Sequence, residues 1–198
     1  MAGRRSDEDA RATREAILRR ATELASVEGF EGLTFGLLAK DLDMSKAGIL
    51  GHFPTKEQLQ LAVYAEAAAT FRRVVVEPGR HDHGLARLRG YCARWADFVS
   101  DSPWPGGCIL TAASFEFDDK PGPMHDAIQQ GALWWRERIR QAAQEAVEAG
   151  ELAPGTDPEQ VAFTIVALAT GTVRVRQTHR DPEAGPRLRR AYDALLRA

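Results

Sequence analysis

Amphipathic helical periodicity is the feature that most constrains the fold of this chain. Apolar residues at a helical spacing would fall on both faces of a strand, so they could not form one buried face of a sheet. Near the C-terminus the apolar residues recur at the i, i+3, i+4, i+7, i+8 spacing of one helix face: they are Leu188, Ala191, Tyr192, Leu195 and Leu196. No segment shows the alternation of apolar and polar residues typical of a half-buried strand. We therefore expect an all-α protein, with a hydrophobic content of 44% supplying its core.

Glycine, proline and capping residues divide this pattern into nine expected helices. Gly29 and Gly150 are natural stops, and Asp157 followed by Pro158 is a natural helix start. The expected helices cover residues 7 or 13 to 27, 35–42, 46–53, 56–75, 85–100, 108–117, 124–149, 158–179 and 186–198. Three of them form an N-terminal domain, residues 1–54, and the other six form a second domain, residues 55–198.

Composition excludes several classes of protein. The net charge of −2 argues against a wholly basic nucleic-acid binder, although it allows a small local reader. Two cysteines are too few for a disulfide framework. The N-terminus lacks the apolar segment of a signal peptide, and the apolar run Val161–Val173 is too short to span a bilayer. We expect a soluble cytoplasmic protein with no membrane partner.

The stretch from Thr34 to Phe53 has the residue pattern of a helix-turn-helix. Two helices that cross around a short turn need a small residue at the crossing, and Ala39 lies there. The turn needs a residue that tolerates positive φ, and Asp43 lies four positions later. Apolar residues at the inward positions seal the motif: Leu38, Leu42, Met44 and Ile49.

The third helix begins with the short side chains Ser45-Lys46-Ala47-Gly48, where a core-forming helix would carry larger apolar residues. A recognition helix needs such a start, because its first turn approaches base edges in the major groove. Ser45 caps the helix, Lys46 reaches phosphate or guanine, and Ala47 packs on a thymine methyl. The predicted DNA-binding residues are Thr34, Ser45, Lys46, Ala47, Gly48, His52 and Lys56. The alternative is an ordinary three-helix bundle.

Residues 13–63 resemble the DNA-binding domain of TetR/AcrR-type transcriptional regulators. The resemblance is carried by "TREAILRRATELASVEGFEGLTF" and "LLAKDLDMSKAGILGHFPTKEQLQLAV", and "PGGCILTAASFEFDDKPGPMHDAI" resembles an effector-domain pattern of one subgroup. It implies an all-helical homodimer that binds a palindromic double-stranded DNA operator and a small molecule. The chain departs from the family pattern at Asp43, where relatives carry Gly, at Gly36, often Arg, and at Leu50, usually aromatic.

The C-terminal half is expected to provide the dimer interface and the ligand site. The helix around Val161–Val173 is apolar nearly all round, so it joins the last helix in a four-helix dimer interface or, alternatively, is a core helix of a monomer. Pockets are mostly apolar with few polar groups. The predicted ligand-binding residues, each of which is alternatively simple core, are Phe98, Trp104, Cys108, Thr111, Phe115, Trp134, Trp135 and Phe163.

No catalytic or metal site is expected. His81-Asp82-His83 has no further ligand at metal-binding spacing nearby, and no nucleophile–base pair is readable. We expect no cofactor and no enzyme activity. The expected function is a ligand-responsive repressor released from its operator by a small molecule. Two alternatives remain: a helical-bundle enzyme or small-molecule-binding protein, and a dimeric scaffold whose helix-turn-helix no longer reads DNA.

Overall fold

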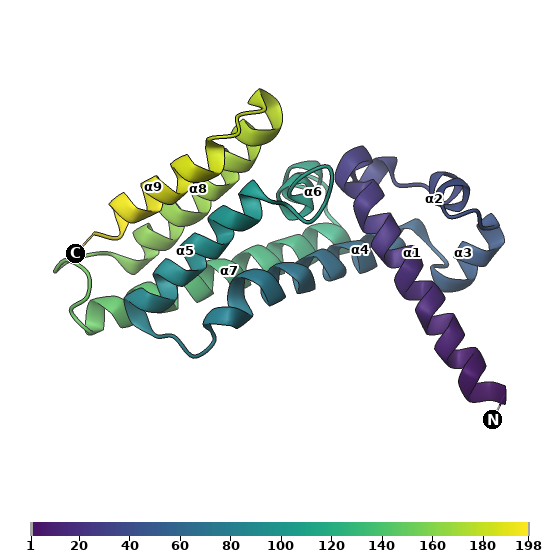
Figure 1. The fold of residues 1–198 in the computed structure, drawn as a ribbon, viewed down its shortest axis with the longest axis horizontal. Helices are drawn as coiled ribbons and strands as arrows, with labels where there is room; N and C mark the ends of the chain where they lie inside the picture. Colours follow the sequence, from purple (N-terminus) through teal and green to yellow (C-terminus); the bar gives the residue numbers. More distant parts are fainter. Residues whose placement is uncertain (1, 198) are drawn as a thin grey trace. The chain divides into compact units, whose positions relative to one another are not determined.

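The computed structural model describes residues 2–197, with side chains from residue 7 onward. Its described residues form nine α-helices and no strands, so the predicted all-α fold is confirmed (Figure 1). The helices are α1 (Ala2–Gly32), α2 (Phe35–Asp41), α3 (Lys46–His52), α4 (Lys56–Phe71), α5 (Gly84–Ser100), α6 (Ile109–Glu116), α7 (Pro123–Glu148), α8 (Pro158–His179) and α9 (Ala184–Leu195).

The helices belong to two compact units that do not follow the chain order. Unit 1 comprises the chain up to Ala68 together with Trp104–Ile128, and therefore contains α1–α3 and α6. Unit 2 comprises Ala69–Pro103 together with the chain from Gln129 onward, and therefore contains α5, α8 and α9. Helices α4 and α7 contribute residues to both units. The predicted domain boundary after residue 54 stays a prediction.

Side-chain hydrogen bonds cap the first turns of α2, α3, α4 and α8. The Thr34 hydroxyl accepts from Leu37 N at 3.1 Å before α2, and the Ser45 hydroxyl accepts from Gly48 N at 3.0 Å before α3. Thr55 accepts from Gln58 N at 3.1 Å before α4. Each cap satisfies a backbone N–H that the first helical turn leaves without a partner. Asp157 likewise caps α8, where Pro158 occupies the first turn.

The end of α1 is held by side chains from two other helices of unit 1. Gly29 leaves the helical conformation, with φ 75° and ψ 168°, where the sequence predicts a stop. The Glu116 carboxylate on α6 accepts from Phe30 N at 2.9 Å and from Glu31 N at 2.6 Å. Gln60 on α4 donates to Phe30 O at 2.8 Å. These bonds satisfy the backbone groups that the break at Gly29 exposes, so the chain re-forms a helical turn as far as Gly32.

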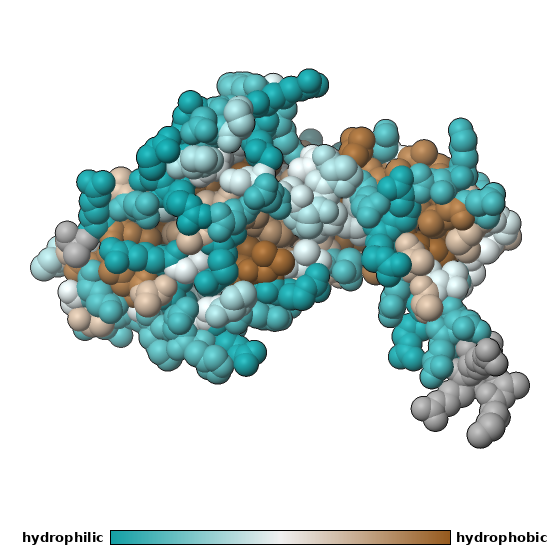
Figure 2. Space-filling model, viewed as in Figure 1, coloured by the Kyte–Doolittle hydropathy of each residue, from teal (hydrophilic) through white to brown (hydrophobic). Residues whose placement is uncertain are grey.

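The helix boundaries differ from prediction mainly at α1 and α4. Helix α1 begins at Ala2, and hydrophilic residues cover its described N-terminal part in Figure 2. Helix α4 ends at Phe71 and continues as a π-helical turn, Arg72–Val76, and a 3₁₀ turn, Glu77–Gly79. A π-turn preserves the helix direction, which is why the sequence pattern does not reveal the change at Phe71.

Unit 2 is built around an aromatic cluster, which we define as Phe71, Tyr91, Trp95, Phe98 and Trp135. Phe71 makes edge-to-face contacts with Trp95, Phe98 and Trp135, at centroid distances of 5.9, 5.4 and 5.1 Å. Helix α9 packs against α5 and α8. The buried Tyr192 hydroxyl donates to Ile165 O at 3.0 Å and so fixes α9 on α8. Within residues 2–197, no helix combines the length and apolar character that crossing a bilayer requires.

Candidate functional site

The helix-turn-helix has the predicted geometry. Asp43 has φ 52°, the left-handed conformation that the turn requires, and Met44 N donates to Ala39 O at 2.9 Å across it. Ala39 is buried where a small residue was required, and Leu38 and Ile49 are fully buried beneath the two helices. The turn is therefore fixed by backbone hydrogen bonding and by the core of unit 1.

Two arginines of α1 hold the helix-turn-helix in place. The Arg20 guanidinium donates to both carboxylate oxygens of Asp41 on α2, one bond being 2.7 Å, and also to Glu23 at 2.6 Å. The hydrogen bond from Arg20, together with its charge, lowers the pKa of Asp41. Arg14 lies over the ring of the buried Phe53, with 4.6 Å from Cζ to the ring centroid. The motif is thus attached to α1 at both ends.

The first turn of α3 presents its backbone and short side chains to solvent. Ser45, Lys46 and Ala47 are exposed, and Thr34 is exposed at the start of α2. Gly48 is half-buried, and a Cβ placed there would lie 3.3 Å from Ser45 Oγ. This surface has the small, polar character that close approach to a DNA groove requires.

The last two predicted DNA-binding residues lie at the other end of α3 and at the start of α4. His52 is half-buried. Lys56 Nζ donates to the backbone oxygen of Glu31 at 2.6 Å and to its carboxylate at 3.1 Å. In the protomer this lysine therefore holds the end of α1.

The departures from the family pattern also lie on this surface. Gly36 is exposed in the first turn of α2, and the atom nearest to a Cβ built there is Thr34 Oγ1, at 4.0 Å. Leu50 is half-buried on α3. Both positions thus offer no side-chain donor to a phosphate, and position 36 has space for one.

Four of the predicted ligand-binding residues lie in unit 2. Phe98 and Trp135 are buried in the aromatic cluster. Trp134 is half-buried, with Arg72 and Arg138 over its ring at 5.3 and 5.5 Å. Phe163 is 63% exposed on α8. The structure therefore brings Phe98 and Trp135 together and places Phe163 on the surface of the protomer.

The other four lie in unit 1. Trp104 and Cys108 are buried, and Thr111 Oγ1 contacts Cys108 Sγ at 3.4 Å on the half-buried side of α6. Phe115 is 53% exposed on the same helix. Burial raises the pKa of the Cys108 thiol, so the thiol is protonated and unreactive at neutral pH. A backbone N–H of this segment, from Gly106, donates to Ser26 Oγ at 3.0 Å and joins it to α1.

Sequence reasoning missed one polar group near the aromatic cluster, Arg94 on α5. Its Nη2 atom is buried and has no hydrogen-bond partner. The available signal was a charged residue between Tyr91, Trp95 and Phe98, which form the apolar face of the same helix. No group of three metal-ligating side chains is found among the described residues, which include His81-Asp82-His83.

A helix-turn-helix with an exposed first turn, joined to a larger helical unit, defines the class of helix-turn-helix transcriptional regulators. Two family models match the sequence: the tetracyclin repressor-like C-terminal domain over residues 84–192, and the bacterial regulatory proteins of the tetR family over residues 17–63. The chain belongs to the TetR family of transcriptional regulators. No curated protein matches it significantly.

Solved structures show the same fold over nearly the whole chain. A TetR transcriptional regulator from Chloroflexus aurantiacus is 26% identical, with a TM-score of 0.85 over 96% of this chain and 94% of that one. NemR from E. coli, in its reduced form, is 22% identical, with a TM-score of 0.79 over 94% and 97%. AibR, solved with isovaleryl coenzyme A and operator DNA, is 21% identical, with a TM-score of 0.74 over 92% and 97%.

Proposed function

We propose that this protein is a ligand-responsive, dimeric transcriptional repressor that a small molecule releases from a palindromic operator. The observation that carries the proposal is the exposed, short-side-chain first turn of α3 on a well-anchored helix-turn-helix. In a three-helix bundle with only a structural role, apolar residues in this turn would pack on the core and add stability, so short exposed side chains are not expected there.

In this proposal the N-terminal residues, 1–54, form the DNA-binding part. Lys46 contacts phosphate or a guanine edge, and Ala47 and Gly48 allow the helix to approach the bases. Thr34, Ser45 and His52 lie beside the DNA backbone. Lys56 exchanges its bond to the Glu31 carboxylate, 3.1 Å in the protomer, for a phosphate.

The dimer is proposed to form through α8 and α9. Phe163, Ala167 and Gly171 are exposed on α8 at four-residue spacing and so lie along one face of this helix. Ala169, by contrast, is buried within its own unit. An exposed apolar face with small residues suits close packing against a second copy, and two copies supply the two recognition helices that a palindrome requires.

The ligand is proposed to bind in residues 55–198, with Phe98 and Trp135 at the centre of its site. Trp134 remains a predicted contact of this site, while Trp104, Cys108, Thr111, Phe115 and Phe163 keep their predicted roles without being placed in it. AibR has been crystallised with both a small molecule and operator DNA, which supports a regulator of this kind. A ligand that prefers the conformation unsuited to the operator lowers DNA affinity, and a coupling of ~1–3 kcal/mol gives ~5–150-fold control.

The test compares binding to DNA upstream of the protein's own gene with binding to random DNA of equal length, at a stated salt concentration. Lys46→Ala is expected to weaken specific binding by ~1–3 kcal/mol. Lys120→Ala is the matched control, because it removes the same charge from unit 1 outside the helix-turn-helix, at an exposed position. Unchanged affinity in Lys46→Ala would remove this residue from the interface.

The second candidate is a small-molecule-binding protein or enzyme whose helix-turn-helix no longer reads DNA. The observation that favours it is the absence of a phosphate donor at Gly36 and Leu50. Equal, weak binding to upstream and random DNA would support this candidate and defeat the repressor.

A further inference from the structure

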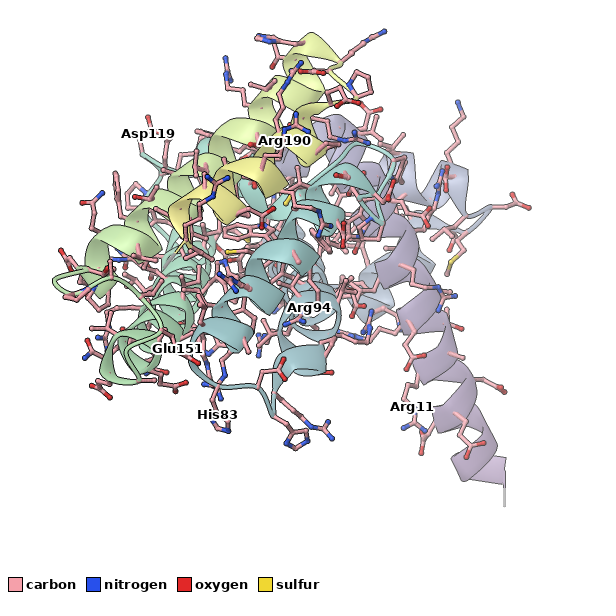
Figure 3. All side chains as sticks on the ribbon, turned by 60° about the vertical axis from the view of Figure 1, so that its left-hand side comes forward. Arg11, His83, Arg94, Asp119, Glu151 and Arg190 are labelled. Atoms are coloured by element: carbon pink, nitrogen blue, oxygen red, sulfur yellow. The ribbon has the colours of Figure 1, made fainter. Side chains whose placement is uncertain are left out.

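Arg94 is half-buried in unit 2, and one nitrogen of its guanidinium is unpaired. Nε donates to Val75 O at 2.7 Å, and Cζ lies 5.8 Å from the centroid of the Tyr91 ring. Nη2 is buried and has no hydrogen-bond partner. Figure 3 labels Arg94 on α5. A full positive charge is thus held against an aromatic ring with a donor left over.

Two glycines, Gly79 and Gly90, lie beside the Arg94 guanidinium and leave room for it, because they have no Cβ. A Cβ on Gly79 would collide with Nη2, and one on Gly90 would lie only 2.9 Å from Nη1. The Cβ built on Gly79 would also lie 3.2 Å from a carboxylate oxygen of Asp82. Even so, no carboxylate among the described side chains comes within the 4.0 Å ion-pair distance of Arg94. Among the described residues, Arg94 thus makes no ion pair.

A second unpaired donor belongs to the same aromatic cluster. Trp135 Nε1 is buried and also has no hydrogen-bond partner. Its ring lies 5.2 Å from the Tyr91 ring and 5.3 Å from the Trp95 ring, between centroids. Buried polar groups are nearly always paired, so two unpaired donors around one tyrosine indicate an acceptor that comes from outside the chain.

We propose that unit 2 binds an apolar small molecule carrying a carboxylate, whose oxygens accept from Arg94 Nη2 and Trp135 Nε1. The apolar body of the ligand packs against the aromatic cluster. One cationic and one neutral donor match a single negative charge, whereas a doubly charged phosphate would leave charge uncompensated. The proposal rests on the proposed function, because it names the chemical class of the effector.

In the test, the full-length, DNA-free protein is titrated with phenylacetate, decanoate, phenylacetamide and decanamide. Isothermal titration calorimetry measures the dissociation constant of each compound. At least one acid is expected to bind more than ~10-fold tighter than its amide, because the amide lacks the charge. Arg94→Gln is expected to weaken acid binding by ~10–100-fold and to leave amide binding unchanged. Trp135→Phe, which removes only the N–H donor, is expected to weaken acid binding by about 5-fold.

Arg138→Gln is the matched control, since it removes the same charge from an exposed position on α7 three residues from Trp135. It is expected to leave acid binding unchanged. If Arg94→Gln does not fold, Arg94→Lys replaces it: this variant keeps the charge but loses the geometry of the guanidinium, and is expected to weaken acid binding less than tenfold. If Arg94→Lys binds the acid as tightly as the Arg138→Gln control does, the proposal is contradicted.

Three results overturn the proposal: no binding by either acid at millimolar concentration, equal affinity for acids and amides, or unchanged acid binding in both Arg94→Gln and Trp135→Phe. Because no DNA is present, these results do not depend on the operator. Operator binding without a preference for acids overturns only the carboxylate proposal. Preference for acids without operator binding overturns only the repressor.

Discussion

At the residue scale, Asp43 carries a backbone strain that glycine would relieve. Its φ of 52° is unfavourable for side chains other than those of Gly, Asn and Asp. Asp43→Gly is therefore expected to be neutral or to stabilise the protein by up to ~1 kcal/mol, because removal of strain offsets the greater freedom of glycine when unfolded. Denaturant unfolding at fixed protein concentration measures the change.

The control for this position is Asp43→Val, whose β-branched side chain suits positive φ least. It is expected to destabilise the protein by ~1–2 kcal/mol. A clear loss of stability in Asp43→Gly would mean that the carboxylate, and not the backbone angle, determines the turn.

Gly36 offers a second test at this scale, because a side chain there has open space. Gly36→Arg is expected to tighten DNA binding by adding a phosphate contact, with the slope of log affinity against log salt steeper by about 0.9 per contact. Gly36→Gln gains the same helix propensity without the charge, and is expected to leave the slope unchanged. Equal slopes in the two variants would place the start of α2 away from the DNA.

Local chemistry explains which residues the sequence could predict. Thr34, Ser45 and Asp157 act on backbone groups two or three positions ahead, so their capping roles follow from short-range spacing. The roles of Arg94 and Trp135 could not be predicted in this way, because these residues stand out only by having a buried donor with no acceptor in the folded unit. No sequence spacing reveals a missing partner.

At the element scale, the ion pair between α1 and α2 makes stability depend on pH. The hydrogen bond from Arg20 lowers the pKa of Asp41 below its ordinary value of 3.8. A lowered folded-state pKa adds stability that is fully present above the unfolded value and is lost as pH falls through the folded value. The contribution therefore disappears on acidification below about pH 3.8.

Asp41→Asn is accordingly expected to unfold at lower temperature than the parent protein at pH 7. The difference is expected to shrink as pH falls below 3.8, where the parent loses the same interaction. Thermal unfolding from pH 7 to pH 2.5 measures it, and Asp118→Asn, an exposed carboxylate in unit 1, is the control. A constant difference across this range would show that Asp41 acts through packing and not through its charge.

Helix positions could be predicted well from periodicity, yet the grouping of the helices could not. The contacts of Glu116 with the end of α1 span 85 and 86 positions in the chain, and Gly106 reaches Ser26 across 80. Such contacts place α6 in unit 1, although it lies far from α1–α3 in the sequence. Periodicity gives the face that a helix buries, but it does not give the element that covers this face.

At the scale of the whole molecule, the exposed face of α8 connects the protomer to the proposed dimer. Phe163 is 63% exposed, an unusual cost for a large apolar side chain unless a partner covers it. Gly171 lies two helical turns further along the same face, and a Cβ built there meets no atom within 4 Å. A side chain at position 171 would therefore meet no other atom of the protomer near its Cβ.

Gly171→Phe uses this space to separate folding from association. The side chain fits in the isolated protomer, so the thermal unfolding of the monomeric variant is expected to remain cooperative. In the proposed dimer it collides with the partner's α8, and the dimer dissociation constant is expected to rise by at least ~30-fold, about 2 kcal/mol. Sedimentation at micromolar concentration is expected to show the parent at twice 21.8 kDa and the variant shifted towards 21.8 kDa.

Ala86→Phe is the control, because it places the same side chain on an exposed position of α5. It is expected to sediment like the parent. Binding to a palindromic DNA is expected to fall only in Gly171→Phe, since two linked recognition helices engage the half-sites together. A dimer that persists in Gly171→Phe would exclude this face of α8 from the interface, and would leave the exposure of Phe163 to be explained by another partner.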